Sequence, residues 1–453
     1  MKDLTKGNII RLLLAFSLPL LIGNIFQQLY NIVDTKVVGE ILGEDALAAI
    51  GASAPVFNLI VGAMNGLGNG FGIVISKFYG AKDMKRMRQA VANSVCLMLG
   101  LTIVVTVVSL FLIRPMLHLL NTPDDILPRC TGYIQVILAF MIFTAAYNLC
   151  AAVLRALGDT IRPLIFLAVA TVVNVGLDLL FVGAMHMDVQ GAAYATVIAQ
   201  AISFVCCIIY IIKKCPELRL RREDFVLEKI MIGDLMGQGL AMAFMLCFVS
   251  IGTLVLQGAI NKFGTNIIAA HTVARKLSEI FMLPFSTLGV AAATFSGQNY
   301  GAGRFDRIRS GIRSAILLSW IWTVFVIVAV YVAAPLMIRL ISGATTPEIV
   351  ETAQRYLRFD TPFYFVLGIL IVLRNALQGL GRKIVPMVSS GIELFGKLIV
   401  AWVLAAPMGY FGIIISEPAT WILCTVLLSI AFFTDDRIRR GSQPKKEKIH
   451  EAD

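Results

Sequence analysis

The chain has 453 residues, of which 58% are hydrophobic and 15% are charged, and its mean hydropathy is +0.82. Soluble globular domains carry about 25% charged residues, so this composition excludes a soluble domain. The net charge of +11 is distributed over separate loops without interleaved aromatic residues, which excludes a nucleic-acid-binding patch. The sequence therefore predicts an all-α polytopic protein embedded in a lipid bilayer.

About twelve apolar stretches are long enough to cross a hydrocarbon core of about 30 Å as helices. The first six are expected at residues 9–38, 45–78, 89–119, 127–155, 161–184 and 190–213. The second six are expected at residues 235–261, 267–299, 307–341, 350–378, 384–406 and 411–434. No small-residue cleavage site interrupts the first stretch, so we expect an uncleaved first span rather than a signal peptide.

The first predicted helix carries a polar stripe within its apolar surface. The stripe residues recur three or four positions apart and so share one helical face: Asn24, Gln27, Gln28, Asn31, Asp34 and Thr35. A carboxylate at mid-membrane costs about 2.5 to 3.5 kcal/mol even on insertion scales, so Asp34 is not expected to face lipid. We expect this face, together with Tyr30, to line a cavity.

Three further helices of the first half supply polar groups. Asn65 and Asn69 share a face of the second helix. Asn174 and Asp178 lie four residues apart in the fifth helix, and Thr196 lies in the sixth. Carboxylate, amide and hydroxyl oxygens can bind a hard cation, and two neighbouring carboxylates can instead share a proton. The structural alternative is that either carboxylate only caps a broken helix or bonds a neighbouring side chain.

The second half carries a different set of charges. Arg275 and Glu279 in the eighth helix and Lys397 in the eleventh are further candidates for a substrate cavity. Lys397 follows Glu393 by four residues, so these two could instead neutralise each other as a structural pair. Asp360, in the tenth helix, is expected to lie near the outer surface and to be solvated.

The two halves of the chain resemble each other in sequence. FYGAKDMKRMR at Phe78–Arg88 aligns with NYGAGRFDRIR at Asn299–Arg309, and LRALGDTIRP at Leu154–Pro163 aligns with LQGLGRKIVP at Leu377–Pro386. Six helices separate the matched loops, so both copies lie on the same side of the membrane, as in parallel repeats. This indicates two pseudo-symmetric six-helix bundles.

The repeat predicts a division of the chain into an N-lobe and a C-lobe. The N-lobe is expected at residues 1–213, a cytoplasmic connector at 214–234, the C-lobe at 235–436 and a basic cytoplasmic tail at 437–453. Rocking of one bundle against the other would open the cleft between them to either side of the membrane, which favours a transporter.

Basic residues concentrate in alternate loops. They follow the second, sixth and eighth helices and close the chain, whereas the intervening loops are short and neutral or acidic. Loops rich in Lys and Arg stay on the cytoplasmic side, so both termini of this multi-pass cell-membrane protein are predicted to be cytoplasmic.

The sequence lacks familiar enzyme signatures. It contains no HExxH, no GKS/T phosphate loop and no GxSxG, which argues against an enzyme. Without a nucleotide-binding loop, transport would have to run on an ion gradient. No cofactor is expected other than H⁺ or Na⁺ as the coupling ion.

At several places the chain resembles the multidrug and toxic compound extrusion family. The motifs are Gln27-x-x-Tyr30-x-x-Val33-Asp34-Thr35-x-x-Val38-Gly39, Tyr79-Gly80-Ala81 with its copy at Tyr300, Leu154–Asp159, and Asn174-x-x-x-Asp178. The resemblance covers nearly the whole chain. It implies twelve helices in two lobes and the export of cationic or amphipathic organic compounds in exchange for H⁺ or Na⁺.

The resemblance also implies site residues. The family's N-lobe cation site, a candidate Na⁺ site, falls on Asp34, Asn174, Asp178 and Thr196. The family's fourth-helix Asn falls on Ala151, with Asn148 one turn earlier as a substitute, and the seventh-helix glutamate of some relatives falls on Val249. This pattern is closer to the prokaryotic DinF-like branch than to the sodium-coupled NorM type.

The leading hypothesis is a secondary active multidrug antiporter that works by alternating access as a monomer. A cation or proton at Asp34 and Asp178 would favour one lobe arrangement and a small organic cation the other, so differential affinity would link the two fluxes. Two alternatives stay open. One is a lipid-linked saccharide flippase of the same superfamily, which needs a strongly cationic cleft, and the other is a membrane enzyme or a non-transporting scaffold.

Overall fold

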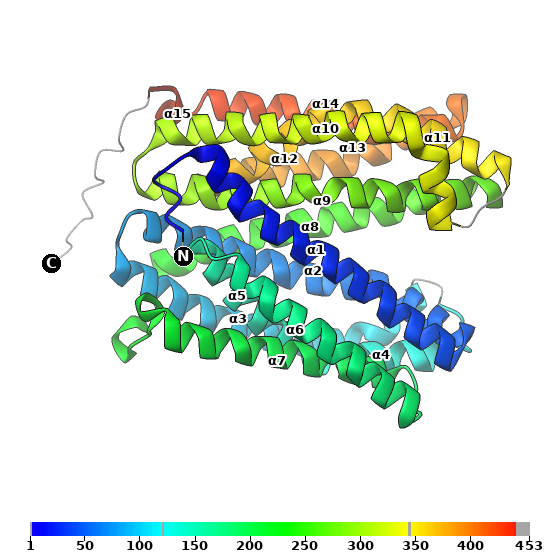
Figure 1. Ribbon diagram of the computed structural model, residues 1–453, viewed down its shortest axis with the longest axis horizontal. Coiled ribbons are helices and arrows are strands. Elements are labelled where there is room, and N and C mark those ends of the chain that lie inside the picture. Colours follow the sequence, from blue (N-terminus) through cyan, green and yellow to red (C-terminus); the bar gives the residue numbers. More distant parts are fainter. Residues whose placement is uncertain (1, 120–121, 343–345, 441–453) are drawn as a thin grey trace. The chain divides into compact units, whose positions relative to one another are not determined.

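The structure is a computed structural model that describes residues 2–119, 122–342 and 346–440, and all regular structure in these ranges is helical (Figure 1). The α-helices of the first half are α1 Ile9–Leu42, α2 Glu44–Gly80, α3 Met84–Leu119, α4 Leu127–Ala139, α5 Met141–Ala156, α6 Ile161–Asp178 and α7 Gln190–Lys214. Those of the second half are α8 Lys229–Ile260, α9 Thr265–Gly301, α10 Phe305–Ser342, α11 Pro347–Asp360, α12 Tyr364–Gly379, α13 Ile384–Met408, α14 Tyr410–Phe433 and α15 Asp436–Arg440.

The predicted set of membrane spans is confirmed. Eleven helical segments of the described chain are long and apolar enough to cross a membrane, and the bent pair α4–α5 makes a twelfth if it forms one span. The fourth span differs from the expected continuous helix, because α4 and α5 meet at an angle of 51°. The break lies at Phe140, and no Pro or Gly at this position predicts it from the sequence.

The chain folds into two compact units. Unit 1 consists of Met1–Lys2, Leu18–Tyr79 and Asp83–Cys247, and unit 2 consists of Asp3–Ser17, Gly80–Lys82 and Phe248–Asp453. This division differs from the predicted lobes in two respects. Its main boundary falls inside α8, and the first turns of α1 belong with unit 2. Residues 441–453 of the predicted tail lie outside the described residues.

Glycines allow a close helix contact inside unit 1. A Cβ added to Gly66 on α2 would stand 2.6 Å from the Ala243 Cα on α8, and one added to Gly70 would stand 2.5 Å from the Gln238 carbonyl oxygen. Since real Cβ atoms do not approach so closely, the backbones of α2 and α8 meet here only because both positions are glycine. Elsewhere in the unit, α7 packs on α4, α5 and α6.

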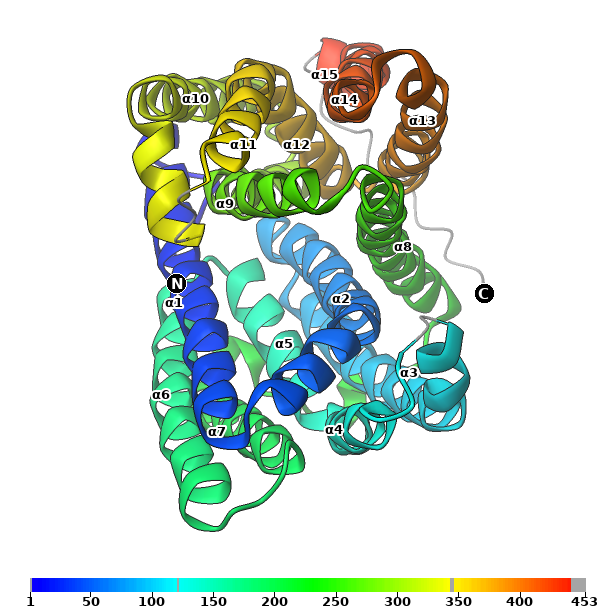
Figure 2. The same ribbon diagram turned by 90° about the vertical axis from the view of Figure 1, so that its right-hand side faces the viewer.

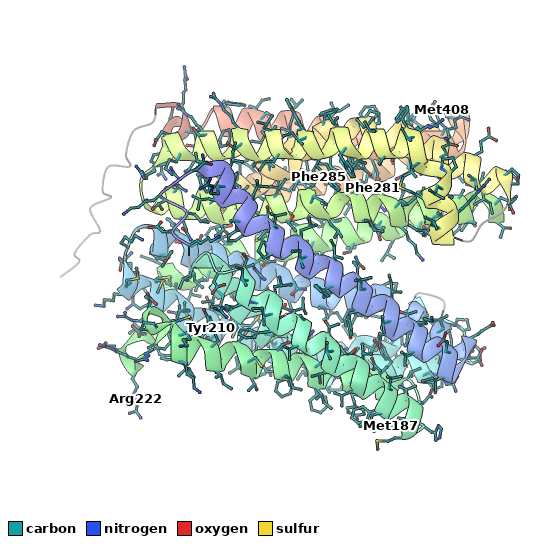
Figure 3. All side chains as sticks on the ribbon, viewed as in Figure 1. Met187, Tyr210, Arg222, Phe281, Phe285 and Met408 are labelled. Atoms are coloured by element: carbon teal, nitrogen blue, oxygen red, sulfur yellow. The ribbon has the colours of Figure 1, made fainter. Side chains whose placement is uncertain are left out.

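The loops of unit 1 separate by charge. Figure 3 shows Arg222, which follows α7, and Met187, which precedes it, at opposite ends of that helix. The loop after α7 carries several Lys and Arg residues, whereas the loop before it is short and carries Asp188. The charge asymmetry read from the sequence is therefore an asymmetry between the two ends of these helices.

Unit 2 is built around α9, which packs against α10, α11 and α12, while α14 packs against α12 and α13 (Figure 2). Phe285 on α9 is buried and meets the Tyr364 ring edge-on at 5.7 Å between ring centres. The segment before α1 is bound to the same unit, since the Leu4 N–H donates to the Gln298 side chain at 3.0 Å. These contacts give unit 2 a core of its own.

Candidate functional site

One face of α1 lines a cavity inside unit 1. The lining includes four of the six polar stripe residues, spaced three or four apart: Asn24, Gln27, Asn31 and Asp34. Gln28 and Thr35 are exposed and lie outside this lining, and the Thr35 hydroxyl donates to the Asn31 carbonyl oxygen at 2.7 Å. Pro19 also belongs to the lining and lies inside the helix.

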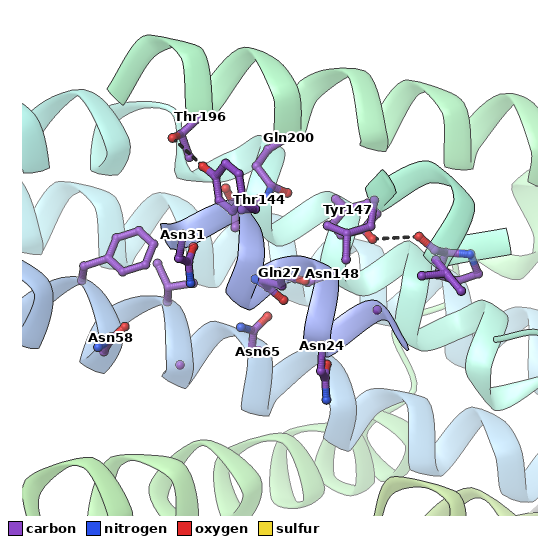
Figure 4. A pocket seen from close by; sticks show the side chains of 18 of the residues that line it. Asn24, Gln27, Asn31, Asn58, Asn65, Thr144, Tyr147, Asn148, Thr196 and Gln200 are labelled. Carbon is purple, nitrogen blue, oxygen red and sulfur yellow. Dashed lines mark hydrogen bonds between the residues drawn. The ribbon is translucent and has the colours of Figure 1, made fainter. Parts of the chain in front are cut away.

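The cavity has a volume of about 370 Å³, which is within the range of small-molecule sites (Figure 4). Amide side chains from three other helices point into it: Asn58 and Asn65 from α2, Asn148 from α5 and Gln200 from α7. Arg155 is also part of the lining, and its guanidinium donates to the Asn69 side-chain oxygen at 3.0 Å. Asn69 itself is not part of the lining.

Two carboxylates meet at the cavity. The side chains of Asp34 on α1 and Asp178 at the end of α6 lie within hydrogen-bonding range of each other. Asp34 is 7% exposed and lines the cavity, whereas Asp178 is 0% exposed behind it. Two carboxylates can hydrogen-bond to each other only if one of them carries a proton. If both are ionised, a cation has to compensate their repulsion.

Tyrosine hydroxyls surround the two carboxylates. The hydroxyls of Tyr30 and Thr196 are 3.0 Å apart, which joins α1 to α7 (Figure 4). Tyr30 and Tyr133 both lie within electrostatic range of the two aspartates. The Tyr30 and Tyr133 side chains therefore lie near both aspartates.

The backbone is irregular next to Asp178. The α-helical part of α6 ends at this residue, and a π-helix continues through Leu179–Ala184. Such π-helical stretches occur mostly as short interruptions and are frequent at functional sites. Asn174, one turn before Asp178, is 1% exposed. The family's cation-site residues therefore converge on one buried region, although their role as ligands stays a prediction.

Several lining residues were not anticipated from the sequence. They are polar or aromatic side chains of α2, α4, α5 and α7: Asn58, Tyr133, Thr144, Tyr147 and Gln200. Asn58, Thr144 and Gln200 lie seven or four residues from Asn65, Asn148 and Thr196 on the same helices, so helical periodicity could have pointed to them. Ala151, which stands where the family has an Asn in the fourth helix, is buried. Asn148, one turn earlier, lines the cavity.

Unit 2 contains a second buried cluster of charges. The Arg275 guanidinium donates to both Glu417 oxygens at 2.9 and 2.8 Å. The Lys397 ammonium lies 3.0 Å from Glu417 and 3.0 Å from Glu393. The Arg374 guanidinium donates to Glu393 at 2.8 Å. Every one of these five charged groups has an opposite charge within contact distance.

The unit 2 charges differ from the sequence expectation in three ways. Asp360 is not solvated but 0% exposed, because α11 packs against α9 and α14. Arg275, a cavity candidate, contacts Glu417 instead, and Lys397 contacts Glu417 as well as Glu393, which is the structural pair left open by the sequence. Glu279, another cavity candidate, is 54% exposed and lies 3.8 Å from Arg275.

Two comparisons identify the relatives of this chain. The sequence model of the MatE family matches it twice, over residues 19–180 and 241–403, which confirms the internal repeat. The chain is 29% identical over 406 residues to YpnP, a probable multidrug resistance protein of Bacillus subtilis (strain 168), covering 89% of this chain and 88% of that protein. It is 27% identical over 434 residues to YoeA, another probable multidrug resistance protein of that organism, covering 94% and 93%.

The fold is also that of solved transporters. A structure described as the outward-facing conformation of a multidrug resistance MATE family transporter of the MOP superfamily matches with a TM-score of 0.87 and 22% identity. The match covers 95% of this chain and 98% of that one. The two copies of the family match span most of the chain. The protein thus belongs to the MatE family of multidrug and toxic compound extrusion proteins and is a membrane transporter, not an enzyme.

Proposed function

We propose that the chain is a proton-coupled antiporter that exports cationic or amphipathic organic compounds across the cell membrane, with both termini in the cytoplasm. The contact between Asp34 and Asp178 carries this proposal. A proton shared by the pair would be released when a cationic substrate compensates its charge. Proton entry and substrate exit would then be linked through one site.

The composition of the cavity supports an organic cation as substrate. Its lining combines the Asp34 carboxylate with neutral amides and the aromatic residues Phe57, Tyr30 and Tyr147. Arg155 also belongs to the lining, where its guanidinium donates to the Asn69 side chain. A carboxylate attracts a positive charge, and aromatic faces add cation–π attraction. The names of the similar proteins, which refer to multidrug resistance, point in the same direction.

The flippase alternative finds less support. It needs a strongly cationic cleft to bind a pyrophosphate, and Arg275, Lys276 and Lys397 were the candidates. Arg275 and Lys397 are paired with Glu417, and Lys397 also with Glu393, whereas Lys276 is exposed. Sodium coupling at Asp34 and Asp178 is the closer competitor, because a Na⁺ ion would compensate the same two carboxylates.

Proteoliposomes can distinguish these functions. The purified chain would be reconstituted, and efflux of a fluorescent cationic dye would be followed under separately imposed proton and sodium gradients. We expect efflux to follow the proton gradient. Efflux that depends on the sodium gradient alone would show that Na⁺, and not H⁺, is the coupling ion. Efflux that is independent of both gradients would contradict an antiporter.

A further inference from the structure

A groove on unit 2 combines an apolar wall with arginines at one end. It has a volume of about 520 Å³ and lies among α10, α12, α14 and α15. Its apolar lining consists of Ile312, Ile316, Trp320, Ile369, Leu373, Phe432, Phe433 and Ile438. Its charged lining consists of Arg309, Arg313 and Arg439, with no Asp or Glu. Figure 1 shows the short helix α15 beside the ends of α10 and α14.

The three groove arginines differ from their neighbours at this end of unit 2. Four other arginines are engaged: Arg304 by the Thr5 carbonyl, Arg307 by the Gly7 carbonyl, Arg382 by Asp435, and Arg437 by the Tyr300 hydroxyl. Among the described residues, no side-chain hydrogen bond or ion pair engages Arg309, Arg313 or Arg439. Their positive charge is therefore available to a ligand.

The groove has the depth of one bilayer leaflet. Arg309, Arg313, Ile316 and Trp320 follow one face of α10 at intervals of three or four residues. The helix rises about 16 Å from Arg309 to Trp320, which is about half of a hydrocarbon core of about 30 Å. A lipid acyl chain extending from the arginines would reach the indole.

The deep end of the groove is held in place. The Trp320 indole N–H donates to the Phe365 carbonyl oxygen at 3.1 Å, and the two rings meet edge-on at 6.0 Å. Trp320 is still 39% exposed, so one side of the ring remains open to an apolar ligand. The apolar wall is thus a formed surface rather than a loose gap.

We propose that this groove binds an anionic phospholipid, with the phosphate at Arg309, Arg313 and Arg439 and an acyl chain along α10 toward Trp320. Guanidinium groups bind phosphate oxygens with paired, charge-assisted hydrogen bonds. Because Arg439 lies on α15 and the other two arginines on α10, the bound lipid also fastens α15 to the unit. The proposal is independent of the coupling ion and of the transported substrate.

Lipid binding by the purified full chain tests this site. Native mass spectrometry in detergent would compare dioleoyl phosphatidylglycerol with dioleoyl phosphatidylcholine, which has the same chains but no net charge. We expect at least about tenfold tighter binding of phosphatidylglycerol, and loss of this preference in the Arg309→Gln/Arg313→Gln/Arg439→Gln variant. An excess of inorganic phosphate should not displace the lipid.

Two variants keep the test independent of folding. Arg339→Gln removes an exposed arginine at the other end of α10 and should keep the full preference. Arg439→Gln alone changes only the short helix α15 and should reduce the preference several-fold at an unchanged melting temperature. Equal binding of the two lipids, an unaltered preference in the triple variant, or displacement by inorganic phosphate would overturn the proposal.

Discussion

The two buried charge clusters of this transporter are built on opposite principles. In unit 1, Asp34 and Asp178 bring like charges together, with hydroxyl groups but no ion-pair partner recorded for Asp34 in the described chain. In unit 2, Arg275, Lys397 and Arg374 alternate with Glu417 and Glu393 at 2.8 to 3.0 Å. One cluster needs a proton or cation from outside, whereas the other supplies its own counterions.

This difference separates a responsive site from a structural one. A like-charge pair changes its energy whenever a proton or cation binds or leaves, so it can report on an ion gradient. An alternating set of opposite charges is most stable in a single arrangement, and removing one member leaves a buried charge uncompensated. Substitutions in the two clusters should therefore have opposite effects on activity and stability.

The largest effect on transport is expected from Asp34→Asn. Gradient-driven dye efflux should fall to the level of empty liposomes, because the amide cannot bind and release the coupling proton. The melting temperature should stay equal or rise, since an amide at this position can donate to the Asp178 carboxylate without a shared proton. Asp45→Asn, at an exposed position in the first turn of α2, should change neither quantity. Normal efflux by Asp34→Asn would remove this aspartate from the mechanism.

The largest effect on stability is expected from Lys397→Met in unit 2. The substitution leaves Glu393 and Glu417 with one cation each but removes both Lys397 contacts, and losing hydrogen bonds to charged groups costs about 1.5 to 3 kcal/mol. The free energy of unfolding, measured by denaturant titration in detergent, should fall by that amount. Lys276→Met, on the exposed side of α9, is the matched control and should leave it unchanged. Equal stability of both variants would contradict a structural role for the cluster.

A smaller effect is expected from Tyr30→Phe. The variant loses the contact between the Tyr30 and Thr196 hydroxyls, and a hydrogen bond of this kind contributes about 0.5 to 1.5 kcal/mol. Efflux should slow a few-fold but still follow the proton gradient. Tyr331→Phe loses the Tyr331 hydrogen bond to the Arg358 carbonyl, at 3.1 Å and outside the site, and should transport normally. If efflux by Tyr30→Phe no longer followed the proton gradient, the Tyr30 hydroxyl would itself take part in proton coupling.

The smallest effect is expected from Asp3→Asn, at an ion pair outside the membrane spans. Partial burial opposes ionisation of Asp3, but hydrogen bonds from Thr5 and the Lys82 ammonium outweigh it and lower its pKa to about 2. A lowered pKa stabilises the fold above the ordinary value of 3.8, and this contribution is lost as the pH falls toward 2. At neutral pH the variant should lose less than about 1 kcal/mol. A melting-temperature loss as large as that of Lys397→Met would contradict the contrast between exposed and buried pairs.

Much of the fold could be predicted from the sequence, because the thickness of the bilayer's hydrocarbon core determines the length of each membrane-spanning helix. The polar face of α1 could also be predicted, since helical periodicity places Asn24, Asn31 and Asp34 on one side. Contacts between helices could not be predicted in this way. Periodicity gives the face of a residue but not the partner helix, so neither the approach of Tyr133 to the aspartates nor the contact of Arg374 with Glu393 was foreseen.

Asp360 and the bend at Phe140 illustrate the same limit. Asp360 was placed near the surface from its position in a span, but its burial depends on the packing of α11 against α9 and α14. The bend between α4 and α5 contains no Pro or Gly, so local sequence preferences do not predict it. In both cases tertiary contacts determine what the local pattern leaves undecided.

The most direct test is proton release on substrate binding. The detergent-solubilised protein would be mixed with a cationic dye in weakly buffered solution, and a pH indicator would count the protons released for each dye bound. We expect the unaltered protein to release protons, and the folded Asp34→Asn and Asp178→Asn variants to release none. Dye binding without proton release by the unaltered protein, or undiminished release by both variants, would contradict this expectation.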